Sequence, residues 1–363
     1  MFRRLFAWIN RYERHLSALA MVGGFTLDNL FFGRVDDLWN TQVVFLTYIA
    51  VCFISIPLLH YIETRAERLG APRPRSRGIL PIATQFALGG FWSGLLIFYG
   101  TSAVIGASWP FLLIIVGIFL GNEILRKYHE RLIFTSVLFF FALYSYTIFA
   151  LPIYTGSIGA LTFLGSGVVA VVVFGLFTVL LRILGRERFF ADIFAIRVGA
   201  AGVLALITFF YFANILPPLP LAAKAGGVYH NVSHVPGTYT ATAESQTWRV
   251  RYLGFAEQLH VVEGGTLYAY ASVFAPTEIR TTIVHRWQWY DEETGQWITR
   301  AAIAYPIQGG RDGGYRGYSA VLMRTPGRWR VSIETADGRV ISRLPFDVAF
   351  VAQSPPLETI TLP

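Results

Sequence analysis

The sequence predicts a membrane-embedded all-α bundle of about seven transmembrane helices, followed by a small all-β sandwich of the immunoglobulin-like kind. Long apolar runs alternate with short charged loops up to about Leu221, and an ordinary globular composition follows. Period-two alternation of apolar and polar residues, typical of half-buried strands, appears only in that second part. We expect a helical domain at 1–216, a Pro-rich linker and leading segment at 217–243, and the β-domain at 244–363.

The apolar runs are long enough to cross a bilayer, which takes about 20 helical residues. They cover approximately residues 16–33, 40–62, 79–106, 109–127, 131–152, 158–184 and 193–216. The first run is the weakest, because Asp28 and Asn29 lie within it; six spans remain if it only lies on the membrane surface. Only 14% of the chain is charged, against about 25% in soluble domains.

Basic residues fall on one side of these spans, which predicts the orientation. Four segments on that side, the N-terminus and three loops, carry Arg3, Arg4, Arg11, Arg14, Arg65, Arg68, Arg73, Arg75, Arg77, Arg126, Lys127, Arg131, Arg182, Arg186 and Arg188. The opposite side holds Arg34 and Lys224. We therefore expect a bacterial inner membrane protein with a cytoplasmic N-terminus and a periplasmic C-terminal domain. The net charge of +8 lies in these loops, so membrane topology accounts for it better than nucleic-acid binding does.

Small residues and charges inside the spans are the candidate sites of the bundle. Gly90-Phe-Trp-Ser-Gly94 and Gly117-Ile-Phe-Leu-Gly121 are patterns that let helices pack closely; a lipid or ligand groove is the alternative. The candidate intramembrane polar residues are Asp28, Glu123 and Arg197, since charges in a span are costly and often functional. Glu123 and Arg197 share a depth and could pair, although each can also be an interfacial residue.

The second part of the chain reads as short strands. In Gly327–Glu334, Trp329, Val331 and Ile333 face one way, and Asp337-Gly338 then predicts a tight hairpin turn before Val340–Phe346. Similar stretches occur at Thr247–Leu253, Thr266–Phe274, Arg280–Tyr290, Trp297–Tyr305 and Gly317–Met323. Strands in this number, with no amphipathic helix, favour a sandwich.

Several of these motifs resemble one bacterial membrane-protein family. They are His285-Arg-Trp-Gln-Trp-Tyr290, Trp297, Arg311-Asp-Gly-Gly-Tyr-Arg-Gly-Tyr-Ser319, Gly327-Arg-Trp-Arg-Val331 with Gly338, and, in the membrane part, Ala107-Ser-Trp-Pro-Phe111 and Gly121-Asn-Glu-Ile-Leu-Arg126. The C-terminal module of that family is domain-of-unknown-function 2914. The resemblance implies a multi-span protein with a small extracytoplasmic domain, and it implies no activity and no catalytic residues.

Few residues of the β-domain point to chemistry. His285, Trp287 and Trp289 alternate onto one strand face, which fits a core with a hydrogen-bonded histidine better than a ligand platform. His230 and His234 have metal-ligand spacing but no third ligand in view. The glycine-rich loop at 309–316 fits a long hairpin turn, and its two arginines could also hold an anion. Candidate partner or ligand contacts there are Arg311, Tyr315, Arg316 and Tyr318.

The sequence contains no P-loop, zincin or serine-hydrolase motif, so we expect no metal or cofactor. The favoured hypothesis is a non-catalytic anchor or scaffold that contacts membrane lipids and presents the β-domain to a partner protein or envelope component. The alternative is a transporter or lipid-handling protein with the β-domain as gate or receptor. A membrane enzyme acting on lipid-linked substrates would need Asp28, His60, Asn122 and Glu123 to meet in one cavity.

Overall fold

A computed structural model describes residues 38–69, 79–102, 105–124, 132–184, 186–218, 220–235, 238–244, 257–275, 279–309 and 314–362. The chain separates into two compact units. The helices form the first unit, and the second contains the strands together with 101–106 and 153–159. We call the strand-bearing part from Pro217 onward the β-domain and describe each unit by itself.

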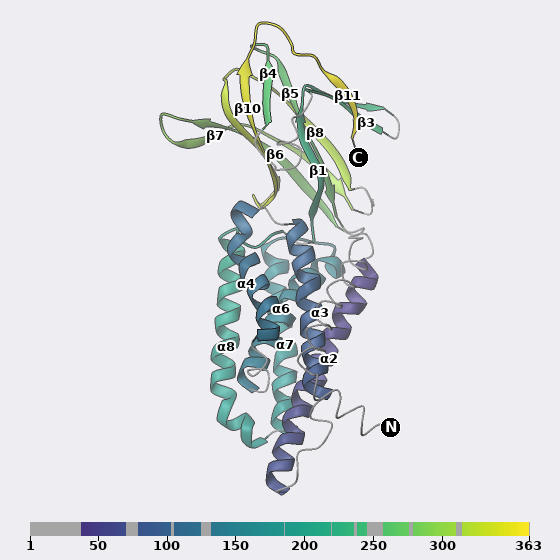
Figure 1. Cartoon of the computed structure of the whole chain (residues 1–363), viewed down its shortest axis with the longest axis vertical. Helices are drawn as coiled ribbons and strands as arrows, with labels where there is room; N and C mark the ends of the chain where they lie inside the picture. The colour runs from purple at the N-terminus through teal and green to yellow at the C-terminus, as the bar shows by residue number, and fades with distance from the viewer. Residues whose placement is uncertain are drawn as a thin grey trace. The chain divides into compact units, whose positions relative to one another are not determined.

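The described residues of the first unit form six helices (Figure 1). They are α2 (Leu38–Leu69), α3 (Ile79–Ser102), α4 (Ile105–Ile124), α6 (Leu132–Thr155), α7 (Ala160–Leu184) and α8 (Arg186–Phe212). All except α4 are long and apolar enough to cross a membrane, which indicates membrane association. In α4 the apolar stretch is the shorter Ser108–Ile118. The run predicted at 16–33 lies outside the described residues.

Several predicted helix limits are wrong. The run predicted at 79–106 corresponds to α3 but extends past its end at Ser102, and α4 begins at Ile105 rather than at 109. Helix α8 begins at Arg186 rather than at 193. Its first residues are Arg, Glu and Arg, which form helices readily but lower the local hydropathy. The prediction rested on apolar runs, so it placed the start of this helix after its charged first turn.

Helix α6 is the most enclosed of the five candidate membrane spans among the described residues. Of its apolar window 83% is buried, compared with 28% for α7 and 17% for α8. Aromatic rings fill the contacts of α6 with α7: the ring centroids of Phe139 and Phe177 are 4.7 Å apart, and those of Phe140 and Phe174 are 4.8 Å apart. A helix that is apolar on all sides is expected where other helices surround it.

The β-domain contains eleven strands among its described residues. They are β1 (Ala222–Tyr229), β2 (Asn231–Val235), β3 (Thr238–Ala243), β4 (Glu257–Val261), β5 (Thr266–Phe274), β6 (Arg280–Asp291), β7 (Gln296–Gln308), β8 (Tyr315–Leu322), β9 (Gly327–Thr335), β10 (Val340–Phe350) and β11 (Glu358–Leu362). The sheet orders are β1-β5-β8, β4-β10-β9-β6-β7 and β11-β3-β2. Pairing is antiparallel except between β10 and β4.

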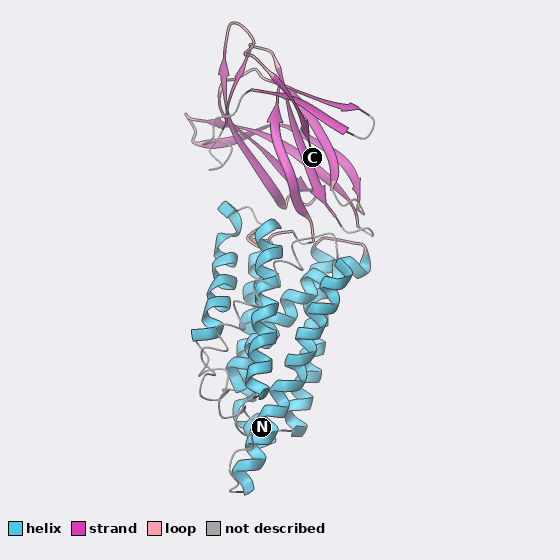
Figure 2. Ribbon diagram, turned by 45° about the vertical axis from the view of Figure 1, so that its right-hand side comes forward, coloured by secondary structure: helices cyan, strands magenta, loops and turns pink. Residues whose placement is uncertain are grey.

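The hydrophobic core lies between the first two sheets, which form layers (Figure 2). Leu267 and Ala269 of β5 pack in one cluster with Trp287 of β6 and Val331 of β9. The sides of the two sheets that meet this core are their inner faces. The third sheet covers the outer face of the β1-β5-β8 sheet, where Tyr270 packs with residues of β2, β3 and β11.

The predicted strands from Thr266 onward are found as β5 to β10, and the turn after β9 has Gly338 at a φ of 82°. The interpretation of 217–243 as a linker is wrong, because β1, β2 and β3 lie within it. Strand β1 is rich in Ala and Gly, which have low β propensity, so its pattern gave no strand signal. Strands β4 and β11 were not predicted, and Thr247–Leu253 lies outside the described residues.

Candidate functional site

The described residues among the contacts predicted at the glycine-rich loop and after it lie on opposite faces of strand β8. Tyr315 pairs with Val273 and is on the inner face, whereas Arg316 and Tyr318, opposite Ser272 and Tyr270, are on the outer face. Arg311 lies outside the described residues. Because side chains of a strand point to alternate faces, these residues belong to two surfaces rather than to one site.

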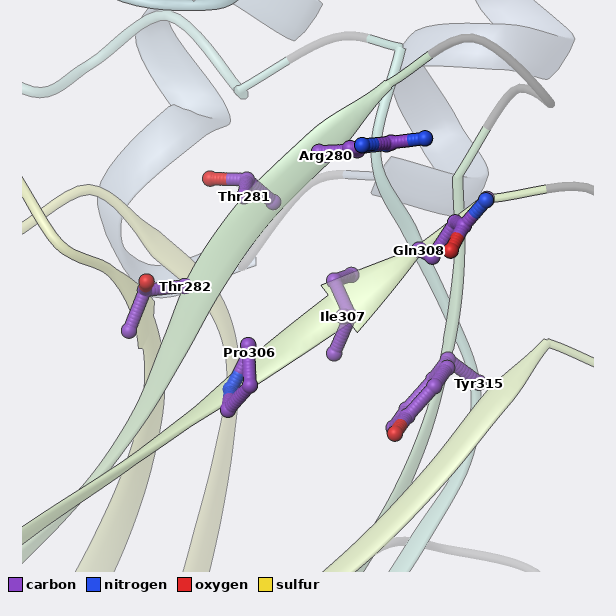
Figure 3. A pocket seen from close by; sticks show the side chains of 8 residues that line it. Arg280, Thr281, Thr282, Pro306, Ile307, Gln308 and Tyr315 are labelled. Atoms are coloured by element: carbon purple, nitrogen blue, oxygen red, sulfur yellow. The ribbon is translucent and has the colours of Figure 1, made fainter.

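The inner-face residue, Tyr315, lines a pocket of about 780 Å³ (Figure 3). The other lining residues come from the start of β6 and the end of β7: Arg280, Thr281, Thr282, Pro306, Ile307, Gln308 and Gly309. The ladder between the strands fixes this set, because Arg280 pairs with Gln308, Thr281 with Ile307 and Thr282 with Pro306. The pocket has the size of small-molecule sites, which measure roughly 300–1,000 Å³.

The described lining of the pocket mixes polar and apolar groups and includes the charge of Arg280. Arg280 and Gln308 lie at one end, Thr282 and Pro306 lie at the other, and Ile307 is between them (Figure 3). Hydroxyl, amide and guanidinium groups can hold a hydrogen-bonding ligand, and the guanidinium favours an anionic group. Among the lining residues that the structure describes, none has an acidic, histidine or cysteine side chain. The described part of the lining therefore has groups that can bind a ligand.

A buried hydrogen-bond network joins β6, β7 and β8 between the sheets. Trp287 donates its indole N–H to Ser319 Oγ at 3.0 Å, and Ser319 Oγ is 2.9 Å from His285 Nδ1. His285 Nε2 is 3.0 Å from the hydroxyl of Tyr305. Burial lowers the pKa of His285 to about 4. The histidine is therefore neutral at pH 7, so that one ring nitrogen donates and the other accepts.

Close packing of β8 against β7 holds the Tyr305 end of this network. A Cβ on Gly317 would lie 2.4 Å from the ring of Tyr305, so a larger residue there would require the ring to shift. Burial also raises the pKa of Tyr305 above its usual range. His285 is 0% exposed. The prediction that His285 is a hydrogen-bonded core residue is thus confirmed.

The family described as "Protein of unknown function (DUF2914)" matches residues 280–348. The chain carries a DUF2914 domain. Strands β6 to β9 lie wholly within the matched segment, and so do all of the residues that line the pocket. The family description gives no activity, so it locates the pocket within the domain and leaves its ligand open.

No curated protein matches this chain. Solved structures with some similarity include the β-glucosidase from Listeria innocua in complex with gluconolactone and the same enzyme in complex with glucose. Each has 12% identity and a TM-score of 0.20, over 32% of this chain and 17% of the other. Another is the Pseudomonas fluorescens alkylpurine DNA glycosylase AlkC bound to DNA containing an abasic site analog. It has 8% identity and a TM-score of 0.20, over 85% and 98% of the two chains. This chain spans less than a fifth of the β-glucosidase chains, and likeness this low carries no functional argument.

The outer-face residues of β8 in the DUF2914 domain join a group of tyrosines. The ring of Tyr318 lies 6.2 Å from that of Tyr268 and 6.4 Å from that of Tyr239, and 42% of Tyr318 is exposed. Beneath it Tyr270 is fully buried, and burial raises its pKa to about 12 although Arg316 acts to lower it. Tyr318 and Arg316 therefore share one surface. Tyr239 and Tyr268 belong to it as well, which the sequence did not predict.

The two histidines with metal-ligand spacing do not come together. His230 Nε2 lies 2.8 Å from Glu244 Oε1, while the ring of His234 packs at a tilt against that of Tyr239, with centroids 4.6 Å apart. His260 adds contacts to Glu244 from its backbone N–H and from Nδ1, both at 2.7 Å. Burial acts to raise the pKa of Glu244, but the hydrogen bonds from His260 and His230 outweigh it and lower the pKa. Among the described residues, no group of His, Cys, Asp or Glu could hold a metal ion.

The candidate polar residues of the bundle are only partly described. Asp28 lies outside the described residues, and so does the side chain of Glu123 on α4, which leaves its pairing with Arg197 a prediction. Arg197 lies on α8 with an exposed side chain. A polar pair that the sequence reading missed lies in α2: His60 Nδ1 is 3.8 Å from Glu63 Oε2, and the side chains are 1% and 6% exposed. The i,i+3 spacing was the available signal.

Proposed function

We propose that this chain is a non-catalytic membrane anchor that presents its DUF2914 domain to a partner protein or an envelope component. In this proposal seven helices cross a bacterial inner membrane, with the N-terminus in the cytoplasm. The β-domain is an immunoglobulin-like sandwich on the periplasmic side. The asymmetry of basic residues supports this orientation. Contact with membrane lipids would be made by the apolar helices.

The pocket is the single observation that carries the proposal. Within the described residues, its lining combines the guanidinium of Arg280 with hydroxyl and amide groups and includes no acidic, histidine or cysteine side chain. Such a lining favours an anionic group of the partner, held by Arg280 and oriented by Thr282 and Gln308, which lie on the same face of the β6–β7 ladder. We propose the pocket as the contact site for that group, with Arg316 and Tyr318 as a separate contact surface on the outer face.

Purification of the tagged full-length chain from its native host, in mild detergent, tests this proposal. Mass spectrometry would compare the wild type with Arg280→Glu and with Arg324→Glu, a matched charge reversal at an exposed arginine outside the pocket. We expect one stoichiometric component that is retained by Arg324→Glu and lost by Arg280→Glu. A partner that survives Arg280→Glu, or a chain that purifies alone in all three forms, would contradict the pocket as the contact site.

The second candidate function, transport or lipid handling, is favoured by the His60–Glu63 pair inside the bundle. Ionisable groups buried in a membrane helix are costly and often mark a pathway. A hydrogen bond of 2.6 Å between the hydroxyls of Ser55 and Thr84 adds a polar contact between α2 and α3. Native mass spectrometry would compare bound lipid or small molecule in the wild type, Glu63→Gln and the exposed control Thr47→Val. Loss in Glu63→Gln alone would support this candidate, and equal retention in all three would remove it.

A further inference from the structure

Strand β7 ends the five-stranded sheet with one long edge open. Its 13 residues run alongside β6 on one side, from Gln296 to Gln308, and all except Arg300 have a partner there. On the other side it has no hydrogen-bonded strand within the part of the chain that the structure describes. Figure 1 shows the β6–β7 hairpin projecting from the sheet. An open edge presents a row of backbone N–H and C=O groups that can pair with another strand.

The usual protection of such an edge is confined to the two ends of β7. Near one end the ladder shifts register at Arg300, where a bulge places a charge, and near the other end lies Pro306. Charge, bulges and proline are the devices that discourage strand addition. Between them the run Ala301-Ala-Ile-Ala-Tyr305 has no charge, glycine, proline or bulge.

The side chains of this run suit close approach of a second strand. Ala302 and Ala304 are exposed on the outer face, where their small size leaves the edge uncovered. Ala301, Ile303 and Tyr305 lie half-buried on the inner face, opposite Trp287, His285 and Ile283 of β6. A strand added at this edge would extend the sheet and cover apolar surface of Ile303 that water now reaches.

We propose that β7 pairs antiparallel with β7 of a second copy of this chain, centred on Ile303. In an antiparallel pair of identical strands, the inner faces of the two copies lie on the same side only if one residue lies opposite the same residue of the other copy. The centre at Ile303 uses the whole unprotected run: Ala302 lies opposite Ala304, and Ala301 lies opposite Tyr305. The bulged Arg300 of each copy then falls opposite Pro306 at the ends, so no like charges meet. A centre at Ala302 or Ala304 would bring Arg300 or Pro306 into the ladder.

A second copy fits this edge better than a free peptide for two reasons. Both copies are held by their apolar helices in one membrane, which raises the effective concentration of one β7 for the other. The pairing is also closed, because a two-fold contact uses the open edge of each partner and leaves none for a third chain. The inference is independent of the pocket and of its ligand.

Two variants at the exposed alanines test the register in the full-length chain. Ala302→Lys with Ala304→Lys places like charges opposite each other in both cross-strand pairs, which destabilises an antiparallel pair. Ala302→Lys with Ala304→Glu places opposite charges in the same two positions. Ala320→Lys, at an exposed alanine on β8, is the matched control for an added charge. Each protein would be placed in lipid nanodiscs and vesicles, and its dimer fraction measured by single-molecule photobleaching against lipid dilution.

We expect the wild type and Ala320→Lys to dimerise equally. The double lysine variant should raise the dissociation constant at least tenfold, and the lysine–glutamate variant should return it to within a few-fold of the wild type. Separately, Ile303→Cys should form an intermolecular disulfide on mild oxidation, since paired Cα atoms at about 4.5–5.5 Å lie within disulfide reach. A wild type that is monomeric at every dilution, or a dimer unchanged by the double lysine variant, would overturn the proposal.

Discussion

The helical bundle and the β-domain place their large apolar side chains in opposite ways. On the bundle the most exposed include Leu161 at 87%, Phe194 at 78% and Ile183 at 70%. In the β-domain Trp287 is fully buried, and several aromatic rings nearer the surface lie against arginines, as where Arg330 lies 4.1 Å from the ring centroid of Trp297. The bundle surface suits lipid and the β-domain surface suits water, so each unit carries the surface of a different solvent.

The two regions also differ in how they satisfy buried polar groups. In the bundle, hydroxyls commonly return to a carbonyl of their own helix, as Ser166 Oγ does to Thr162 O at 2.9 Å. In the β-domain, the His285–Ser319–Trp287 network crosses between the two sheets. Loss of one member should therefore remain local in the bundle and should weaken the contact between sheets in the β-domain.

The largest expected effect comes from Trp287→Ala in the β-domain. This change removes a fully buried ring and leaves Ser319 Oγ without its indole donor, so it should cost about 3–5 kcal/mol of unfolding free energy. Trp297→Ala, on the outer face of the same sheet, removes a partly exposed ring over Arg330 and should cost about 1 kcal/mol. Denaturant unfolding of the full chain in detergent, followed by tryptophan fluorescence, measures both.

An equal loss of unfolding free energy in Trp287→Ala and Trp297→Ala would contradict the expected difference between the inner and outer faces. The helical unit provides the internal reference, because its circular dichroism at 222 nm should be unchanged by either substitution. A loss of helix signal in Trp287→Ala would mean that the two units do not unfold separately.

Hydropathy and alternation predicted the parts of the fold that rest on simple patterns. The apolar runs of α2, α6 and α7 are long and uninterrupted, and β6 and β9 contain stretches in which apolar and polar residues alternate. Strand β1 was not predicted because its Ala and Gly residues give no alternating pattern. Strand β4 was not predicted because it has only five residues. Pairing between distant strands could not be predicted, since β4 lies beside β10 in parallel.

The candidate site was predicted only as a neighbourhood. The glycine-rich loop drew attention to Tyr315, which does line the pocket. Arg280 and Gln308 are 28 residues apart and meet only through the β6–β7 register, which a single sequence does not specify. The same limit applies to Glu244, which the sequence gave no reason to place between His230 and His260.

The second prediction concerns the pH dependence of the β-domain. His285 has a pKa of about 4 in the folded domain and an ordinary value of 6.5 when unfolded. Between these pH values the unfolded chain binds more protons, so stability is full above pH 6.5 and falls as the pH drops toward 4. The difference corresponds to about 3 kcal/mol. Unfolding free energies from pH 7.5 to 4 should show this loss, and His285→Gln should remove it.

Glu244, with its partners His230 and His260, also contributes to the pH dependence of stability and must be separated from the effect of His285. Its carboxylate has a lowered pKa, so its contribution is present above the ordinary value of 4.5 and is lost as the pH falls further. These three residues are present in both proteins, so the difference between the wild type and His285→Gln isolates the effect of His285. Parallel pH curves for the two proteins would show that His285 does not stay neutral inside the domain.

The smallest expected effect tests packing within the bundle, where two glycines of α8 form a matched pair. A Cβ on Gly199 would lie 2.4 Å from a methyl carbon of Val137 on α6, whereas one on Gly202 would meet no atom within 4 Å. Gly199→Ala should therefore cost about 1–2 kcal/mol through overpacking, and Gly202→Ala should be neutral or slightly stabilising because Ala favours helix. Thermal unfolding of the helical signal in nanodiscs measures both. If the two substitutions shift the midpoint equally, the packing of α8 against α6 does not depend on the missing side chain of Gly199. The helix contacts of the bundle would then tolerate a change in side-chain volume, whereas the core of the β-domain is expected not to tolerate one.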